Sequence, residues 1–230
     1  MTDHQPPGGG LDRLMPPEIK DDKFYRAIAR IAATPGVRQV LEIGASSGGG
    51  STEAWVAGAL RNPVRPTIHC IEVSVTRFAA LAERWKGHEF VRCYNVSSVP
   101  LESFPSDDEV LRFRSETRSK LCNVRPEKVL GWLQQDRDYI TAHGLSRHGI
   151  REIRSAAGVD VFDAVLIDGS EFTGKAELEE TYGARFLLLD DIRSFKNWET
   201  YRRLKDDPAY RLVTRSRWTR NGFAVFERAS

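Results

Sequence analysis

The segment Val40-Leu-Glu-Ile-Gly-Ala-Ser-Ser-Gly-Gly-Gly-Ser-Thr52 decides the fold of this chain. The apolar run at 37–43 predicts a buried strand that ends at Gly44, and residues 51–60 predict a helix that follows it. Glycines between a strand and a helix allow a sharp turn and let a ligand approach the bare backbone. Because the first N–H groups of a helix lack internal partners, the segment is typical of a ligand-binding loop.

The alternation of strands and helices continues on both sides of this segment. A helix is expected at 18–33; further strands are expected at 67–71, 90–94, 161–167 and 186–189, and further helices at 76–86, 175–182 and 198–205. Such alternation predicts a doubly wound, mostly parallel α/β sheet. The tail, 210–219 and 222–227, alternates around Asn221-Gly222 and predicts an antiparallel hairpin, which completes seven strands.

Two segments interrupt this pattern. Residues 98–158 are too long for an ordinary connection, so we expect a helical insertion there, with helices at 110–121 and 127–142. Residues 1–17 are rich in proline and glycine and are predicted to form a flexible arm. The remainder, 18–230, is expected to be a single domain, because 230 residues suit one core.

Composition excludes several classes of protein. The chain has 34 basic and 32 acidic residues, so its net charge of +2 gives no nucleic-acid signature. Three cysteines without paired spacing argue against a disulfide scaffold or a zinc site. No apolar run is long enough to span a membrane, and no apolar signal core is visible, so we expect a cytoplasmic protein.

Two acidic residues at strand ends indicate the ligand. Glu72 closes the second predicted strand and can accept both hydroxyls of a ribose, while Glu42 can pair with an amino group. The pair therefore favours a nucleoside joined to a cationic group. A dinucleotide is the alternative, but Ser46 stands where its pyrophosphate needs a glycine. A solvated strand end at Glu72 is the other alternative.

These segments resemble the motifs of class I S-adenosylmethionine-dependent methyltransferases, which have a Rossmann-like fold. VLEIGASSGGGST resembles motif I, E/D-x-G-x-G-x-G, with Ser46 in place of the middle glycine. IHCIEVS resembles motif II and FDAVLIDGS the fourth motif, whereas the match of YNVS to the adenine-contacting segment is loose. The resemblance covers 37–97 and 159–228. It implies S-adenosylmethionine as cofactor, held by Glu42, Gly44, Ser46, Gly48, Glu72, Asn95, Val96 and Asp168.

Three aspartates follow the fourth and fifth predicted strands, namely Asp168, Asp190 and Asp191. Parallel strands bring such ends together, and carboxylate oxygens suit Mg²⁺. The layout resembles metal-dependent O-methyltransferases of the catechol and macrolide-sugar types, which implies that the three aspartates are metal ligands. Their separation, 190 − 168 = 22, is short for that group, and the basic residue expected after Asp168 is absent. Helix capping is the alternative role for the pair at 190–191.

Methyl transfer also requires removal of a proton from the acceptor. The candidate catalytic residues are Asp168, His143, His148 and Lys175, with Lys196 as a further lysine that would serve if desolvated. An ordinary helix end is the alternative for His143, and solvation is the alternative for both lysines. Aromatic side chains near the expected mouth can stack on an acceptor or belong to the core: Trp132, Tyr139, Phe172, Phe195 and Trp198.

The sequence therefore favours O-methylation of a small molecule or sugar, with or without a divalent metal. A nucleic-acid methyltransferase is the alternative, with phosphate contacts from two arginine groups: Arg112, Arg114, Arg118 and Arg125, then Arg211, Arg215, Arg217 and Arg220. A non-catalytic protein that binds S-adenosylmethionine is the third hypothesis. A homodimer is a further hypothesis, for which the insertion would supply the contact.

Overall fold

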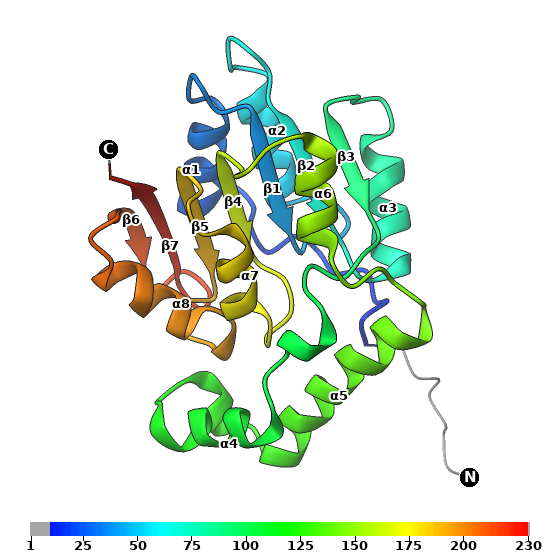
Figure 1. Cartoon of the computed structure of the whole chain (residues 1–230), viewed down its shortest axis with the longest axis vertical. Coiled ribbons are helices and arrows are strands. Elements are labelled where there is room, and N and C mark those ends of the chain that lie inside the picture. The colour runs from blue at the N-terminus through cyan, green and yellow to red at the C-terminus, as the bar shows by residue number, and fades with distance from the viewer. Residues whose placement is uncertain (1–9, 230) are drawn as a thin grey trace.

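The computed structural model describes residues 10–229 and contains one seven-stranded sheet (Figure 1). The strands occur in the order β3-β2-β1-β4-β5-β7-β6. Their bounds are β1 Gln39–Ile43, β2 Thr67–Ile71, β3 Val91–Tyr94, β4 Ala164–Ile167, β5 Phe186–Asp190, β6 Tyr210–Ser216 and β7 Phe223–Arg228. The predicted α/β sheet, mostly parallel with an antiparallel hairpin at its C-terminal edge, is confirmed.

The strand order reverses beside β1, which pairs in parallel with both β2 and β4. The pairs β2–β3 and β4–β5 are also parallel, whereas β7 is antiparallel to β5 and to β6. In open α/β sheets, ligands bind at the carboxyl ends of the strands where the order reverses. The fold therefore places the expected site between the ends of β1, β2 and β4.

Helices cover both faces of the sheet because neighbouring strand residues point to opposite faces. One core contains Val40 and Leu166 with residues of α1 (Lys23–Ala32), α2 (Ser51–Ala59) and α3 (Val75–Trp85). The other contains Leu41 and Val165 with residues of α6 (Gly149–Ala157), α7 (Gly174–Thr181) and α8 (Phe195–Asp206). The strands are apolar on both faces, as expected for a doubly wound sheet.

Capping side chains set several helix boundaries. The Asp22 side chain accepts a hydrogen bond from Tyr25 N, so α1 begins at Lys23 and not at Glu18 as predicted. In the insertion, Ser106 and Glu109 form a capping box that starts α4 at Asp107. The helix predicted at 110–121 is therefore shifted, and α4 ends at Glu116.

The insertion lies beyond the carboxyl ends of the parallel strands, where α4 (Asp107–Glu116) and α5 (Pro126–Ala142) are seen in Figure 1. Two short 3-10 helices, η1 Leu101–Ser103 and η2 Lys120–Asn123, complete it. The helix α6 falls within the segment expected as insertion, but it packs in the core as the crossover helix before β4. Its first residue, Gly149, allows close approach, because a Cβ there would lie 2.5 Å from Val96 Cγ2.

The expected N-terminal arm is described only from residue 10, and residues 1–9 lie outside the described part. Asp12 accepts hydrogen bonds from Ser74 Oγ at 2.8 Å and from the Tyr139 hydroxyl at 2.6 Å. Residues 10–17 therefore run against α3 and the insertion. Within residues 10–229, no helix combines the length and the apolar character needed to span a bilayer.

The C-terminal hairpin has a longer connection than the expected Asn221-Gly222 turn. Strand β6 ends at Ser216, whose Oγ accepts a hydrogen bond from Thr219 N at 3.1 Å. Arg220 has a positive φ of 52° and reaches back to the sheet. The connection thus carries a side chain that belongs to the site described next.

Candidate active site

A cavity of about 380 Å³ opens at the point where the strand order reverses. It is lined by the loops after β1, β2, β4 and β5, by the N-terminal segment and by α5. Eight of the candidate residues named from the sequence line it, namely Gly44, Ser46, Glu72, Val96, Asp168, Asp190, Asp191 and Lys196. Its volume lies within the range of ordinary small-molecule pockets.

The loop after β1 is fixed by its contacts with β2 and β4. Gly44 has a φ of +87°, and a Cβ there would lie 2.1 Å from the Asp168 carbonyl oxygen. The N–H groups of Gly44 and Ala45 both donate to Ile71 O at 3.0 Å. Only glycine can join these strand ends so closely, so the loop presents backbone to the cavity.

Glu72 projects from the end of β2 into this loop and is 4% exposed. One of its carboxylate oxygens accepts from Ser46 N at 2.7 Å and the other from Ser74 N at 2.8 Å. Burial raises the pKa of Glu72, and the backbone donors oppose that rise. A carboxylate offers about four lone-pair sites, so two sites remain for hydroxyls of a ligand.

Three residues expected at the cofactor lie beneath the cavity surface. Glu42 is fully buried and accepts a hydrogen bond from Thr52 Oγ1 at 2.7 Å. Asn95 Nδ2 donates to the carbonyl oxygen of Glu72 at 2.8 Å. Gly48 leaves room for Trp85, whose Nε1 lies 2.5 Å from where a Cβ would stand. These residues support the binding loops and are absent from the cavity lining.

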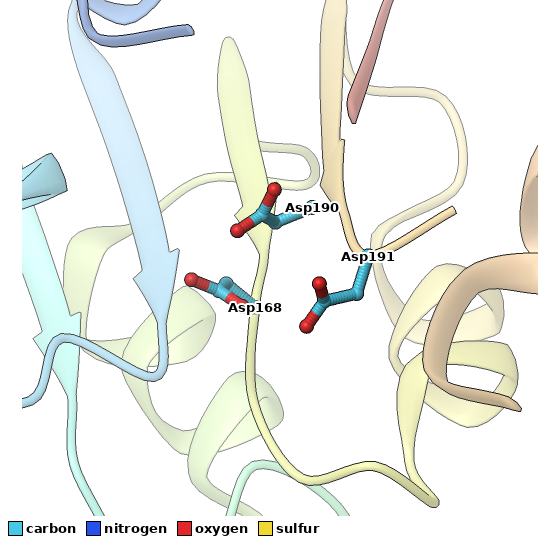
Figure 2. A group of neighbouring side chains, drawn as sticks. All are labelled: Asp168, Asp190 and Asp191. Carbon is cyan, nitrogen blue, oxygen red and sulfur yellow. The ribbon is translucent and has the colours of Figure 1, made fainter. Parts of the chain in front are cut away.

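Asp168, Asp190 and Asp191 converge at the ends of β4 and β5 (Figure 2). One carboxylate oxygen from each lies within 4.8 Å of the others. Asp191 has a left-handed backbone, with φ at 55°, which is unusual for a residue with a side chain. The sequence-based expectation that strand ends bring the three together therefore agrees with the geometry.

Two protein cations already pair with this aspartate trio. Lys196 Nζ lies 2.7 Å from Asp168 Oδ1 and 3.0 Å from Asp191 Oδ2. Arg220 lies 2.9 Å from Asp190 Oδ1 and also pairs with Asp22. A divalent ion needs several of these oxygens at about 2.1 Å and would have to displace the lysine. As arranged, the trio does not fit a resident metal ion.

Sequence reasoning missed Asp136, which α5 brings to the same cavity. Its Oδ2 accepts a hydrogen bond at 2.5 Å from the Oγ of Ser170, a residue that follows Asp168 by two positions in the sequence. Burial raises the pKa of Asp136 to about 6, and the Ser170 hydroxyl opposes only part of that rise. No basic side chain within the described chain forms an ion pair with it. A carboxylate with this pKa can exchange protons near neutral pH.

The remaining candidate bases lie outside this cavity. His143 stacks on Tyr139, with ring centroids 4.0 Å apart, and His148 precedes the first turn of α6. Lys175 pairs with Glu199 at 3.3 Å on the rim of a second cavity.

The second cavity, of about 650 Å³, lies between the insertion and helices α7 and α8. Its lining is aromatic in part, with Phe104, Phe113, Phe172, Phe195 and Trp198. Phe104 and Lys196 line both cavities, so the two adjoin. Of the five aromatic residues singled out in the sequence, three therefore reach this second cavity: Phe172, Phe195 and Trp198.

No protein-family model and no curated protein matches the sequence. Solved structures share its fold. A protein assigned as a caffeoyl-CoA O-methyltransferase from Staphylococcus aureus is 13% identical, with a TM-score of 0.54 over 92% of this chain and 85% of that one. A methyltransferase from Geobacter sulfurreducens is also 13% identical, with a TM-score of 0.52 over 93% and 81%. A protein assigned as an O-methyltransferase from Klebsiella pneumoniae is 12% identical, with a TM-score of 0.51 over 90% and 79%. The chain therefore has the Rossmann-like fold of these methyltransferases.

Proposed function

We propose that this chain is an S-adenosylmethionine-dependent methyltransferase that acts on a hydroxyl group of a small molecule. The observation that carries the proposal is Glu72, a buried carboxylate held by Ser46 N at the mouth of the glycine loop. A carboxylate at the end of β2 is where nucleotide-binding sheets hold a ribose. The side chain at Ser46 disfavours a dinucleotide, whose pyrophosphate needs bare backbone there.

The solved structures of the same fold support this choice. Two of those above are described as O-methyltransferases, and a further one, Rv0187 from MTB, was solved with its cofactor bound. That protein is 15% identical, with a TM-score of 0.51 over 93% of this chain and 83% of that one. Since likeness at this level concerns the fold, the assignment of activity depends on the cavity itself.

The chemistry asked of the residues is alignment and proton removal. The acceptor oxygen displaces the sulfonium sulfur from the methyl carbon, and its proton must pass to a base. Asp136 lies in the cavity, has no cationic partner among residues 10–229, and is the carboxylate suited to take that proton. The second cavity, joined at Phe104 and Lys196, offers an aromatic floor for the body of the acceptor.

A metal-assisted reaction at the aspartate trio is the alternative mechanism. It would require Lys196 to leave Asp168 and Asp191, because its ammonium now lies between those carboxylates. Were a metal bound, it would supply a Lewis acid for the acceptor oxygen. A chelator distinguishes the two mechanisms, because activity that depends on Asp136 and needs no metal persists in EDTA.

A nucleic-acid acceptor is less well supported by the contacts of the arginines. Arg114 donates to carbonyl oxygens within the insertion, and Arg211 pairs with Glu227 at 2.7 Å. Arg220 is engaged with Asp190 and Asp22. Arg114 and Arg220 are therefore occupied by contacts within the fold, whereas Arg211 remains largely exposed beside Glu227. A non-catalytic role would leave Asp136 as an unexplained partly buried carboxylate.

The proposal is tested by measuring S-adenosylhomocysteine release with panels of phenols, sugars and RNA, with and without EDTA. Release with a phenol or sugar in EDTA supports the proposal as stated. Release only with RNA, or binding of S-adenosylmethionine without release on any acceptor, supports the nucleic-acid or the non-catalytic alternative. If the wild-type protein does not bind S-adenosylmethionine, the proposed function is contradicted.

A further inference from the structure

Lys196 bridges two carboxylates of the aspartate trio. Its ammonium lies 2.7 Å from Asp168 Oδ1 and 3.0 Å from Asp191 Oδ2, and its side chain is 9% exposed. The third carboxylate, Asp190, pairs with Arg220. Each of the three carboxylates therefore already pairs with a cationic side chain of the protein.

The fold holds Lys196 in this place. The next residue, Asn197, leaves helical geometry and donates from Nδ2 to the carbonyl oxygens of Ile167 at 2.9 Å and Asp190 at 2.6 Å. Gly174 lets α7 approach, because a Cβ there would lie 1.9 Å from Lys196 O. Backbone contacts to β4, β5 and α7 thus fix the lysine, which is unlike a freely moving surface side chain.

The charges of the trio favour an ammonium between Asp168 and Asp191. Although burial opposes it, the surrounding carboxylates hold the pKa of Lys196 well above its usual value. Lys196 in turn holds the pKa of Asp191 below its usual value, again against burial. The strained backbone of Asp191 directs its carboxylate to this pair, and strain of that kind is typical of functional sites.

We propose that Lys196 replaces a divalent cation in this chain, so that the aspartate trio holds an ammonium and not Mg²⁺ or Mn²⁺. Two of its three N–H groups are used by Asp168 and Asp191. The third has no acceptor within the described chain, and Lys196 lines both cavities. One consequence rests on the proposed function. The oxygen of the acceptor hydroxyl would accept a hydrogen bond from this third N–H, which would lower the pKa of that hydroxyl.

Binding of Mn²⁺ tests this inference without an acceptor. Metal-free wild type and Lys196→Met are titrated with Mn²⁺ and followed by electron paramagnetic resonance, because methionine keeps the length of the side chain and removes its charge. Lys205→Met on the same helix is the control, since the one ion pair of Lys205 in the described part of the chain is with its exposed neighbour Asp206. We expect wild type and control to bind weakly, and Lys196→Met to bind on the order of tenfold more tightly or better. The gain should be lost when Asp191→Asn is added.

Two results would overturn the inference. One is stoichiometric Mn²⁺ binding by wild type that is lost in Asp191→Asn. The other is a Lys196→Met variant that is folded, as judged by circular dichroism, but shows no gain in affinity for Mn²⁺. If the methionine variant does not fold, Lys196→Gln takes its place. S-adenosylmethionine is titrated into the same samples. If Lys196→Met binds Mn²⁺ more tightly as expected but S-adenosylmethionine fails to bind, the proposed function is wrong. The inference that Lys196 takes the place of a divalent cation then still stands.

Discussion

Replacing Asp136 by asparagine is expected to stabilise the protein at neutral pH. Burial raises the pKa of Asp136 from 3.8 to about 6, so the folded chain binds this proton more tightly than the unfolded chain. A carboxyl group with a raised pKa lowers stability as pH rises from about 4 to about 6. The shift, 6 − 3.8 = 2.2, corresponds to about 3 kcal/mol at 1.36 kcal/mol per pKa unit.

Asparagine keeps an acceptor for Ser170 Oγ, as the carboxylate does now, but it cannot ionise. Urea unfolding of wild type and Asp136→Asn at pH 4, 6 and 8 measures the effect. The variant should gain little at pH 4 and about 2–3 kcal/mol at pH 8. Asp138→Asn is the control, because Asp138 is exposed on the same helix and accepts a hydrogen bond from Gln134 on that helix.

A gain that does not depend on pH, or a loss at pH 8, would refute the argument that burial penalises this carboxylate. A residue that destabilises the fold in its working charge state is often one retained for activity. Once an acceptor is known, Asp136→Asn should lower the rate of methyl transfer while the affinity for S-adenosylmethionine is kept. Unchanged rate and pH profile would remove Asp136 from the mechanism.

Three other substitutions follow from the contacts of the fold. Gly44→Ala should abolish cofactor binding and lower thermal stability, since a Cβ would collide with the Asp168 carbonyl. Gly131→Ala, which places its Cβ in open space on α5, should instead stabilise the fold by about 0.5–1 kcal/mol. Arg220→Met should destabilise by about 3 kcal/mol in chemical denaturation, because two carboxylates lose their cation, and an unchanged midpoint would contradict this. Tyr139→Phe should release the N-terminal segment, seen as faster limited proteolysis near residue 12, and equal rates would show that its hydroxyl does not hold that segment.

The fold could be predicted because the strands are marked by apolar runs with glycine or acidic residues at their ends. Strand β2 begins and ends as predicted, and β1 and β3 differ by one or two residues at their starts. Helix α6 was missed because it starts at His148-Gly149, which is not a capping signal. Gly149 is there for close packing against Val96, and that requirement is visible only in three dimensions.

The candidate site could be predicted only in part, for a similar reason. Asp168, Asp190 and Asp191 are adjacent because parallel strands end together, which follows from the order of elements. Asp136 depends on where the insertion folds back, and no local pattern determines that position. Lys196 was visible as a candidate lysine, but its pairing with the trio depends on the kink at Asn197.

The proposed function stands on the cavity at the strand-order reversal, and calorimetric titration with S-adenosylmethionine tests it most directly. The wild type should bind with micromolar affinity. Glu72→Gln should bind about 10–100-fold more weakly, because hydrogen bonds from hydroxyls to a charged acceptor are worth about 1.5–3 kcal/mol. Glu83→Gln, an exposed substitution on α3, should bind as wild type does. Absence of binding by a folded wild type, or equal affinity in Glu72→Gln, would contradict the assignment of this cavity to S-adenosylmethionine.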